Sequence, residues 1–296
     1  MTKHPPFPSV GFLGLGAMGA LMAHHLENTG VPIVAFDVDP AKRAAFETPA
    51  ASPAEVAERC EWIVCMLPHP DVVREVLLGD QGVASHARAG TMVIDMSTTG
   101  PEVDVVCAEA LAARGIDLID GPVGKGTWAA GNGELIILAG GTAAQIEKAR
   151  WLLELLGSDV LHCGPLGSGQ VVKLANNIAT CANLAAAFEA YQLVQRSGAN
   201  VDALLDVMRQ TAADSWQLNN TVARALQEDY SLGFKGSLAL KDLHLALSVA
   251  QTIGADVPTA AGTLRWYERS VEVGDGELDV GAIFKLLKHA PGAPAR

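Results

Sequence analysis

The stretch Val10-Gly11-Phe12-Leu13-Gly14-Leu15-Gly16-Ala17-Met18-Gly19 decides the fold of this chain. It is an apolar run that breaks into Gly-x-Gly-x-x-Gly, and a helical segment over residues 17–28 follows. A second apolar run over residues 31–36 then ends on Asp37. This order of strand, glycine turn, helix, strand and acid is typical of a dinucleotide-binding unit. We therefore predict a nucleotide site at the glycine turn.

Each glycine of the turn has its own predicted task. Gly14 permits the tight turn, Gly16 lets the backbone approach a pyrophosphate, and Gly19 lets the helix pack close to the strand. The free N–H groups and the positive end of the helix dipole then face the phosphates. The cofactor contacts predicted here are Gly14, Leu15, Gly16, Ala17, Met18, Gly19 and Asp37.

Asp37 also predicts which dinucleotide binds. A carboxylate in this place accepts hydrogen bonds from ribose hydroxyls, and it repels a 2′-phosphate. No arginine is adjacent in Asp37-Val38-Asp39, although Lys42 and Arg43 follow on the next helical segment. We therefore predict NAD(H) rather than NADP(H) as the cofactor.

Length and composition limit the classes of protein that this chain can be. It has 296 residues, of which 49% are hydrophobic and 18% charged, and its net charge is −12. This length gives room for one large or two medium domains. The charge argues against nucleic acid and anionic membranes as partners, and no apolar run is long enough to span a bilayer. A small anionic substrate is still compatible, because a pocket can be locally basic.

The N-terminus, the cysteines and the histidines favour a cytoplasmic protein without a metal site. The apolar start resembles a signal peptide, but Pro6 and Pro8 precede the apolar run, and the glycine spacing has a better explanation. Five widely spaced cysteines without Cys-x-x-Cys favour reduced thiols. The eight histidines form no metal-binding pattern, so we predict no metal.

The first half of the chain alternates strand and helix signals. The strand-like runs are residues 62–67, 91–96, 117–120, 135–139 and 159–162. Near-continuous apolar strands that alternate with helices imply a mainly parallel sheet covered on both faces. We predict an α/β Rossmann domain over residues 1–166.

The second half has helical signals and no convincing strands. The helical segments lie near residues 168–196, 201–212, 216–228, 237–253 and 257–273. We predict an all-α domain over residues 167–296, joined to the first domain by the long interdomain helix at 168–196. Alanine is frequent in that helix, which predicts a subunit or domain interface. The tail from His289 is predicted to be disordered.

Lys173 is the candidate for moving a proton on or off a substrate oxygen, a task that lysine, histidine or tyrosine usually performs. It lies in the otherwise apolar first part of the long helix, where an isolated charge is costly unless it is paired or used. Asn177 is four residues further on and therefore shares its helix face. The alternative is a lysine that extends from the helix into solvent.

Four motifs, spread over nearly the whole chain, resemble the β-hydroxyacid dehydrogenases, a family that includes 3-hydroxyisobutyrate dehydrogenase and tartronate semialdehyde reductase. They are the glycine turn with Met18, Asp120-Gly121-Pro122-Val123 with residues 131–135 and 139–141, Gly167-x-Gly169-x-x-x-Lys173-x-x-x-Asn177, and Lys241-Asp242-Leu243. Met66-Leu67-Pro68 and Asp95-Met96-Ser97-Thr98 also resemble family segments.

The resemblance implies a Rossmann domain, a 6-phosphogluconate dehydrogenase-like C-terminal domain and a homodimer or homotetramer, with the active site in the cleft between domains. It implies that Lys173 is the catalytic general acid and base. The residues predicted for the substrate are Ser97, Gly124, Lys125, Gly126, Asn176, Asn177 and Lys241, of which Lys125 comes from the departure described below. Those that the resemblance adds for the cofactor are Leu67, Pro68, Thr98 and, again, Lys241.

One loop departs from the family pattern. After Pro122-Val123, relatives commonly have Ser-Gly-Gly, whereas this chain has Gly124-Lys125-Gly126-Thr127. A serine hydroxyl that helps to bind a carboxylate is lost, and an ammonium group is gained. The loop resembles the Gly-Arg-Thr stretch of sulfolactaldehyde reductase, which acts on a sulfonated aldehyde. The alternative is that Lys125 points into solvent.

These features together predict an NAD(H)-dependent oxidoreductase that interconverts a short hydroxy acid, or its sulfonate analogue, and the semialdehyde. We favour a substrate of the sulfolactaldehyde or 4-hydroxybutyrate type over 3-hydroxyisobutyrate or tartronate semialdehyde. An imine reductase has the same architecture but usually carries Asp or Tyr in place of Lys173. A non-catalytic nucleotide-binding protein is the third reading.

Overall fold

The computed structural model describes residues 7–231 and 233–288. It divides the chain into two compact units, Met1–Lys173 and Leu174–Arg296. Pro6 and the tail from His289, which entered the predictions above, lie outside the described residues.

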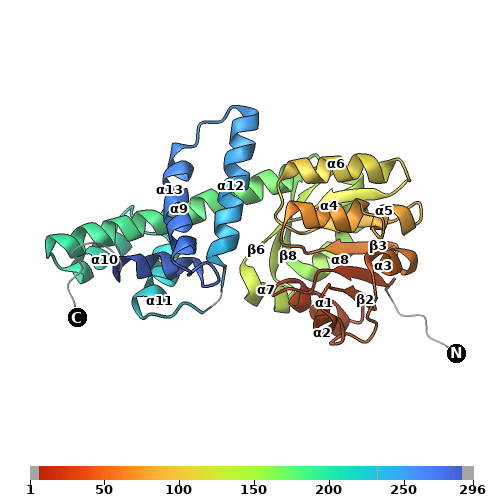
Figure 1. Cartoon of the computed structure of the whole chain (residues 1–296), viewed down its shortest axis with the longest axis horizontal. Helices are drawn as coiled ribbons and strands as arrows, with labels where there is room; N and C mark the ends of the chain where they lie inside the picture. Colours follow the sequence, from red (N-terminus) through yellow and green to blue (C-terminus); the bar gives the residue numbers. More distant parts are fainter. Residues whose placement is uncertain (1–6, 232, 289–296) are drawn as a thin grey trace. The chain divides into compact units, whose positions relative to one another are not determined.

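The first unit contains an eight-stranded sheet (Figure 1). Its strands are β1 (Val10–Leu13), β2 (Ile33–Phe36), β3 (Trp62–Cys65), β4 (Met92–Asp95), β5 (Asp117–Asp120), β6 (Val123–Gly124), β7 (Leu135–Gly140) and β8 (Gly157–Gly164). Their order is β2-β1-β3-β4-β5-β7-β6, and β8 pairs with β7. The five strands β1 to β5 are parallel to one another, which confirms the predicted Rossmann sheet.

The far part of the sheet is less regular than the sequence predicts. β7 runs antiparallel to both β5 and β6. The segment between β5 and β7 contains the two-residue strand β6 and the seven-residue helix α7 (Gly126–Asn132). This connection lacks the long crossover helix that usually returns a chain to a parallel neighbour.

Helices cover the sheet on both faces (Figure 1). Besides α7 they are α1 (Gly19–Asn28), α2 (Pro40–Arg43), α3 (Pro53–Arg59), α4 (Pro70–Leu78), α5 (Val83–His86), α6 (Pro101–Ala112) and α8 (Ala143–Leu156). One apolar cluster joins Phe12 and Ile94 to α1 and α8, and the other joins Ile63 to α3, α4 and α6. Both faces of the sheet are therefore buried, as the apolar strands predict. The helix α1 begins at Gly19, two residues later than predicted, because Ala17 and Met18 belong to the turn.

The second unit is helical. Its elements are most of α9 (Ser168–Ser197), then α10 (Val201–Arg209), the π-helix η1 (Leu218–Val222), α11 (Ala223–Leu226), α12 (Gly236–Ile253), α13 (Pro258–Glu272) and the 3₁₀-helix η2 (Val280–Lys288). The aromatic rings of Phe188 and Phe284 pack edge to face in its core, their centroids 5.4 Å apart. The sequence missed η2, whose short 3₁₀ turns lack the long helical period.

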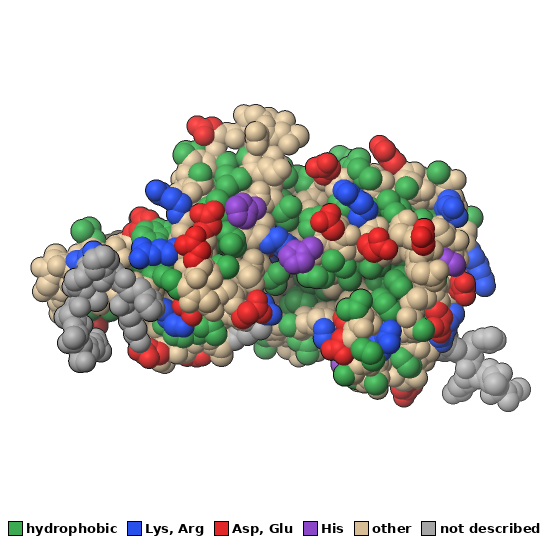
Figure 2. Space-filling view, viewed as in Figure 1, with side chains coloured by type: hydrophobic (Ala, Val, Ile, Leu, Met, Phe, Trp, Pro, Cys, Tyr) green, Lys and Arg blue, Asp and Glu red, His purple; other side chains and the backbone are tan. Residues whose placement is uncertain are grey.

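Two further observations concern the charges on the surface and the character of the helices. On the face shown in Figure 2, acidic and basic side chains are interspersed. Within residues 7–231 and 233–288, no helix has both the length and the apolar character needed to cross a membrane.

Candidate active site

The carboxyl ends of four parallel strands meet at one edge of the first unit's sheet. Leu13 pairs with Cys65, Cys65 with Asp95, and Asp95 with Asp120, so these strands end level with one another. The order of the strands reverses between β2 and β3, on either side of β1, and such a switch point is where open α/β sheets bind ligands. The predicted glycine turn follows β1 directly at this edge.

The glycine turn needs glycine for two different reasons. Gly14 has φ +98°, and a Cβ there would lie 2.4 Å from the Met66 carbonyl oxygen. A Cβ on Gly19 would lie 2.0 Å from the Gly14 carbonyl oxygen, so the helix start closes tightly on the turn. Above Gly16 no heavy atom lies within 4 Å of the Cβ position. The turn is thus packed from beneath and open above Gly16, which fits a pyrophosphate against the backbone.

Asp37 lies at the end of β2 and is only 8% exposed. Its Oδ2 accepts the Leu15 N–H at 2.8 Å, and its Oδ1 accepts the Asp39 N–H at 2.9 Å. Lys42 Nζ lies 3.6 Å from Oδ1. The carboxylate is therefore oriented by the backbone next to the glycine turn and keeps lone pairs for further hydrogen bonds. This donor and acceptor set fits the ribose of a bound NAD.

The segments after β3 and β4 hold each other in place. Ser97 is fully buried, and its Oγ accepts the Leu67 N–H at 2.8 Å. Pro68 is exposed, and Thr98 is half-buried. The structure therefore gives the Ser97 hydroxyl an internal partner in support of the Leu67 backbone, whereas Pro68 and Thr98 lie nearer the surface.

The loop 121–126 holds its lysine in an uncommon backbone conformation. Lys125 has φ +76° and precedes α7, and Gly126 has φ +77°. The Lys125 Nζ donates to Ser158 Oγ at 3.0 Å and lies 3.3 Å from Asp159 Oδ2. The Ser158 hydroxyl and then the Lys125 ammonium lower the pKa of Asp159. Lys125 thus carries an exposed ion pair to β8 that the sequence did not predict.

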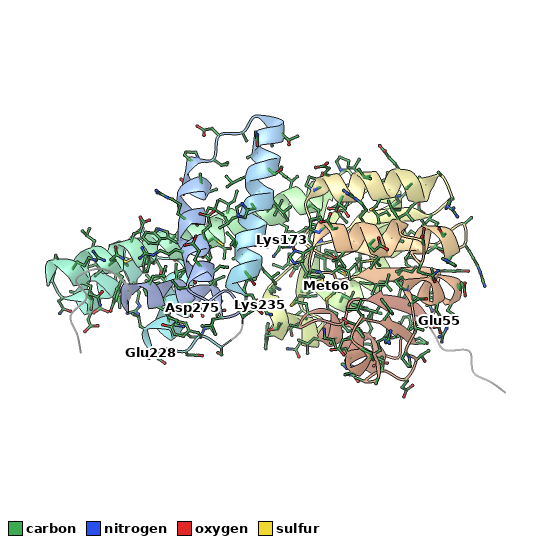
Figure 3. The ribbon with its side chains drawn as sticks, viewed as in Figure 1. Glu55, Met66, Lys173, Glu228, Lys235 and Asp275 are labelled. Atoms are coloured by element: carbon green, nitrogen blue, oxygen red, sulfur yellow. The ribbon has the colours of Figure 1, made fainter. Side chains whose placement is uncertain are left out.

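Lys173 lies near the start of α9 and is half-buried (Figure 3). Gly167, at φ +87°, directly precedes the helix. The first turn of the helix lies at the carboxyl ends of β4 and β5, where Asp120 and Gln170 fix it. Lys173 therefore lies a few residues beyond these contacts, near the start of a helix that is attached to this edge of the sheet.

In the second unit the remaining candidates gather around Asp242. Asn177 is buried, and its Nδ2 donates to Asp242 Oδ2 at 2.7 Å. Lys241 Nζ lies 3.0 Å from Asp242 Oδ1, and Asn176 Nδ2 donates to Asn177 Oδ1 at 3.3 Å. Asp242 therefore orients two of the predicted substrate residues, a task that the sequence did not assign to it.

The sequence analysis also did not predict a cluster of buried acidic residues beneath this edge of the sheet. Asp95, Asp104 and Asp120 are fully buried. Burial, and then the charge of Asp95, raises the pKa of Asp104 well above its ordinary value. Burial also raises the pKa of Asp120, against the opposing effect of the Gly167 and Gln170 N–H groups. The available signal was that Asp95 and Asp120 both end apolar strands. No cluster among the described residues has the makings of a metal site.

Comparisons with known proteins agree with this geometry. Residues 9–164 match the model for the NAD binding domain of 6-phosphogluconate dehydrogenase, and residues 167–287 match that for the NAD-binding of NADP-dependent 3-hydroxyisobutyrate dehydrogenase. The 3-sulfolactaldehyde reductase of Escherichia coli is 36% identical, over 97% of this chain and 98% of that protein. The 3-hydroxyisobutyrate dehydrogenase of Pseudomonas aeruginosa is 35% identical, over 94% and 98%.

A solved structure supports the same assignment. The 3-hydroxyisobutyrate dehydrogenase of Mycobacterium tuberculosis with L-serine has a TM-score of 0.87 and 27% identity, covering 95% of this chain and 99% of that one. The chain belongs to the β-hydroxyacid dehydrogenase family. It is an oxidoreductase of this family with NAD as its cofactor.

Proposed function

We propose that this protein interconverts a short semialdehyde that carries a remote anion and the corresponding hydroxy acid, with NAD(H). Bound NAD supplies or accepts the hydride in this chemistry. Lys173, as an ammonium, donates a proton to the carbonyl oxygen during reduction and takes it back in the reverse direction. Asn177 holds the substrate next to Lys173, with its amide oriented by Asp242.

The observation that carries this proposal is the attachment of the Lys173 helix to the ligand-binding edge of the sheet. Asp120 accepts the Gly167 and Gln170 N–H groups at 2.7 and 2.9 Å, so the first turn of α9 is fixed where β5 ends. Lys173 follows Gln170 by three residues, which is less than one helical turn. An exposed lysine elsewhere on a helix would have no such connection to the dinucleotide edge.

Lys125 supports an anionic substrate. A residue other than glycine with positive φ is uncommon, and such positions often mark functional loops. Its present partner, Asp159, is exposed, and exposed ion pairs are weak, so a substrate anion can replace Asp159 at little cost. The similarity to a 3-sulfolactaldehyde reductase favours a sulfonate, and a carboxylate one carbon further away, as in succinic semialdehyde, is the second choice.

A substrate panel tests this proposal. The initial rate of NADH oxidation is measured with sulfolactaldehyde, succinic semialdehyde, tartronate semialdehyde, the semialdehyde of 3-hydroxyisobutyrate and a cyclic imine. We expect the highest kcat/KM with one of the first two. A clear preference for the third or fourth would overturn the remote-anion proposal, and activity with the imine alone would indicate an imine reductase. No turnover with any of them would favour a non-catalytic nucleotide-binding protein.

We also propose that the protein forms a homodimer or homotetramer. Support comes from large apolar side chains on the second unit that are well exposed, with Leu193 at 72%, Trp216 at 68% and Ile253 at 66%. Exposed apolar side chains of this size mark protein–protein interfaces where they form one contiguous patch. Light scattering coupled to size-exclusion chromatography gives the mass directly, and a monomer at micromolar concentration would contradict the proposal.

A further inference from the structure

Asp120 binds the start of α9 with both of its carboxylate oxygens. Oδ1 accepts the Gly167 N–H at 2.7 Å, and Oδ2 accepts the Gln170 N–H at 2.9 Å. The first N–H groups of a helix lack partners inside the helix and need an acceptor from elsewhere. Here that acceptor is a fully buried side chain at the end of β5, which comes 47 residues earlier than Gly167 in the chain. A charge-assisted bond of this kind fixes the helix start more firmly than a neutral one.

Gln170 binds the same helix start to the loop after β4. Its Oε1 accepts the N–H groups of Thr99 and Gly100 at 3.1 and 3.2 Å. Its Nε2 donates to the Ser97 carbonyl oxygen at 3.0 Å, and the side chain is fully buried. Donor and acceptor atoms of this amide therefore both serve to join α9 to residues 97–100.

Two glycines allow this close approach. A Cβ on Gly169 would lie 1.9 Å from the Leu138 carbonyl oxygen and 2.6 Å from Asp120 Oδ2. A Cβ on Gly140 would lie 2.0 Å from Asp120 Oδ1. A side chain at Gly169 would push the helix start away from the strand ends, and one at Gly140 would displace the Asp120 carboxylate that binds the helix start. Within Gly167-x-Gly169, the second glycine is thus required for packing, whereas the first is required for its φ of +87°.

We infer that Asp120 and Gln170 are positioning residues that fix the ammonium of Lys173 relative to the edge of the sheet. Lys173 comes three residues after Gln170, which is about 4.5 Å along the helix axis. A displacement or rotation of the first turn therefore moves Lys173 with it. A misplacement of about 1 Å at a reacting group can cost about a hundredfold in rate. This inference rests on the proposed role of Lys173 as the proton donor.

The substitution Asp120→Asn tests the inference with little change of shape. It replaces one of the two acceptor oxygens with an NH₂ group, which cannot accept an N–H of α9. We expect kcat to fall about ten- to a hundredfold while the Kd for NADH stays unchanged. Gln170→Met removes the other connection and should give the same result, so it carries the test if Asp120→Asn does not fold. Asp117→Asn, in the same strand but only half-buried and paired with Lys148, is the matched control and should keep the wild-type kcat.

The decisive comparison is made in the Lys173→Ala background. If Asp120 acts through Lys173, then Asp120→Asn costs nothing further once Lys173 is gone. A merely structural role would lower kcat by the same factor in both backgrounds and would overturn the inference. Wild-type kcat in folded Asp120→Asn and Gln170→Met would overturn it too. Failure of the proposed function looks different, because Lys173→Ala itself would then keep its turnover.

Discussion

The Leu15 N–H donates a 2.8 Å hydrogen bond to Asp37 Oδ2, which ties the end of β2 to the glycine turn after β1. The two residues are 22 positions apart in the chain. Asp37 therefore has a place in the fold as well as a proposed place at the ribose. A substitution that tests the role at the ribose should therefore preserve an acceptor for the Leu15 N–H.

Cofactor choice depends on the Asp37 carboxylate. We expect the wild-type protein to have a higher kcat/KM with NADH than with NADPH, because a carboxylate repels a 2′-phosphate. Asp37→Ala should narrow that gap, and Asp37→Asn should narrow it while keeping an acceptor for the Leu15 N–H. Asp39→Asn, an exposed acid two residues away, is the control. Comparable kcat/KM values for NADH and NADPH in the wild type would contradict the prediction.

Lys125 and Asp159 should act in opposite directions on the KM for an anionic substrate. Lys125→Ala should raise this KM about ten- to a hundredfold, which is the usual worth of a charge-assisted contact. Asp159→Asn removes the competing anion and should lower it. The KM for NADH should not change in either variant.

A lysine in a similar exposed ion pair provides the control for this pair of variants. Lys148 lies 3.1 Å from Asp117, and Lys148→Ala should leave the KM for the substrate unchanged. If Lys125→Ala behaves in the same way as Lys148→Ala, Lys125 is an ordinary solvated loop residue.

Asp104 should make stability depend on pH. Its ordinary pKa is 3.8, and burial and the charge of Asp95 raise the pKa in the folded protein well above this value. The folded protein therefore holds a proton that the unfolded chain loses, so the stability contributed by protonated Asp104 falls as the pH rises above 3.8. Asp104→Asn removes this dependence.

We expect the free energy of unfolding of Asp104→Asn to increase relative to the wild type as pH rises from about 5 towards the folded pKa, by up to about 1.4 kcal/mol per pH unit. Chemical denaturation at several pH values measures the difference. Glu109→Gln, an exposed acid on the same helix, serves as the comparison. A constant difference between Asp104→Asn and wild type would show that Asp104 titrates alike in the folded and unfolded states.

The parts of the fold that short stretches encode could be predicted from the sequence. The glycine turn, the apolar strands and the helices have periods that are visible within a dozen residues, and the strand positions agree with the structure. The antiparallel direction of β7 could not be predicted, because it depends on how the segment 121–134 turns back onto the sheet.

In the candidate site, too, locally encoded features could be predicted and contacts between distant residues could not. Asp37 could be proposed from its place after a strand. The ion pair of Lys125 joins residues 34 positions apart, and the hydrogen bond from Gln170 to Asp120 joins residues 50 apart. Such pairs carry no local period, so only the folded structure reveals them. The burial of Ser97 was hidden for the same reason, since its partner is the backbone of another loop.

The kcat of Lys173→Ala, measured with the best substrate of the panel alongside the Kd for NADH, tests the proposed mechanism most directly. Removal of a general acid typically costs about 10²–10⁴-fold in rate. We expect a loss of this size in kcat with NADH binding retained, because Lys173 moves the substrate proton and the glycine turn binds the cofactor. Near-normal turnover in Lys173→Ala would contradict the proposed mechanism.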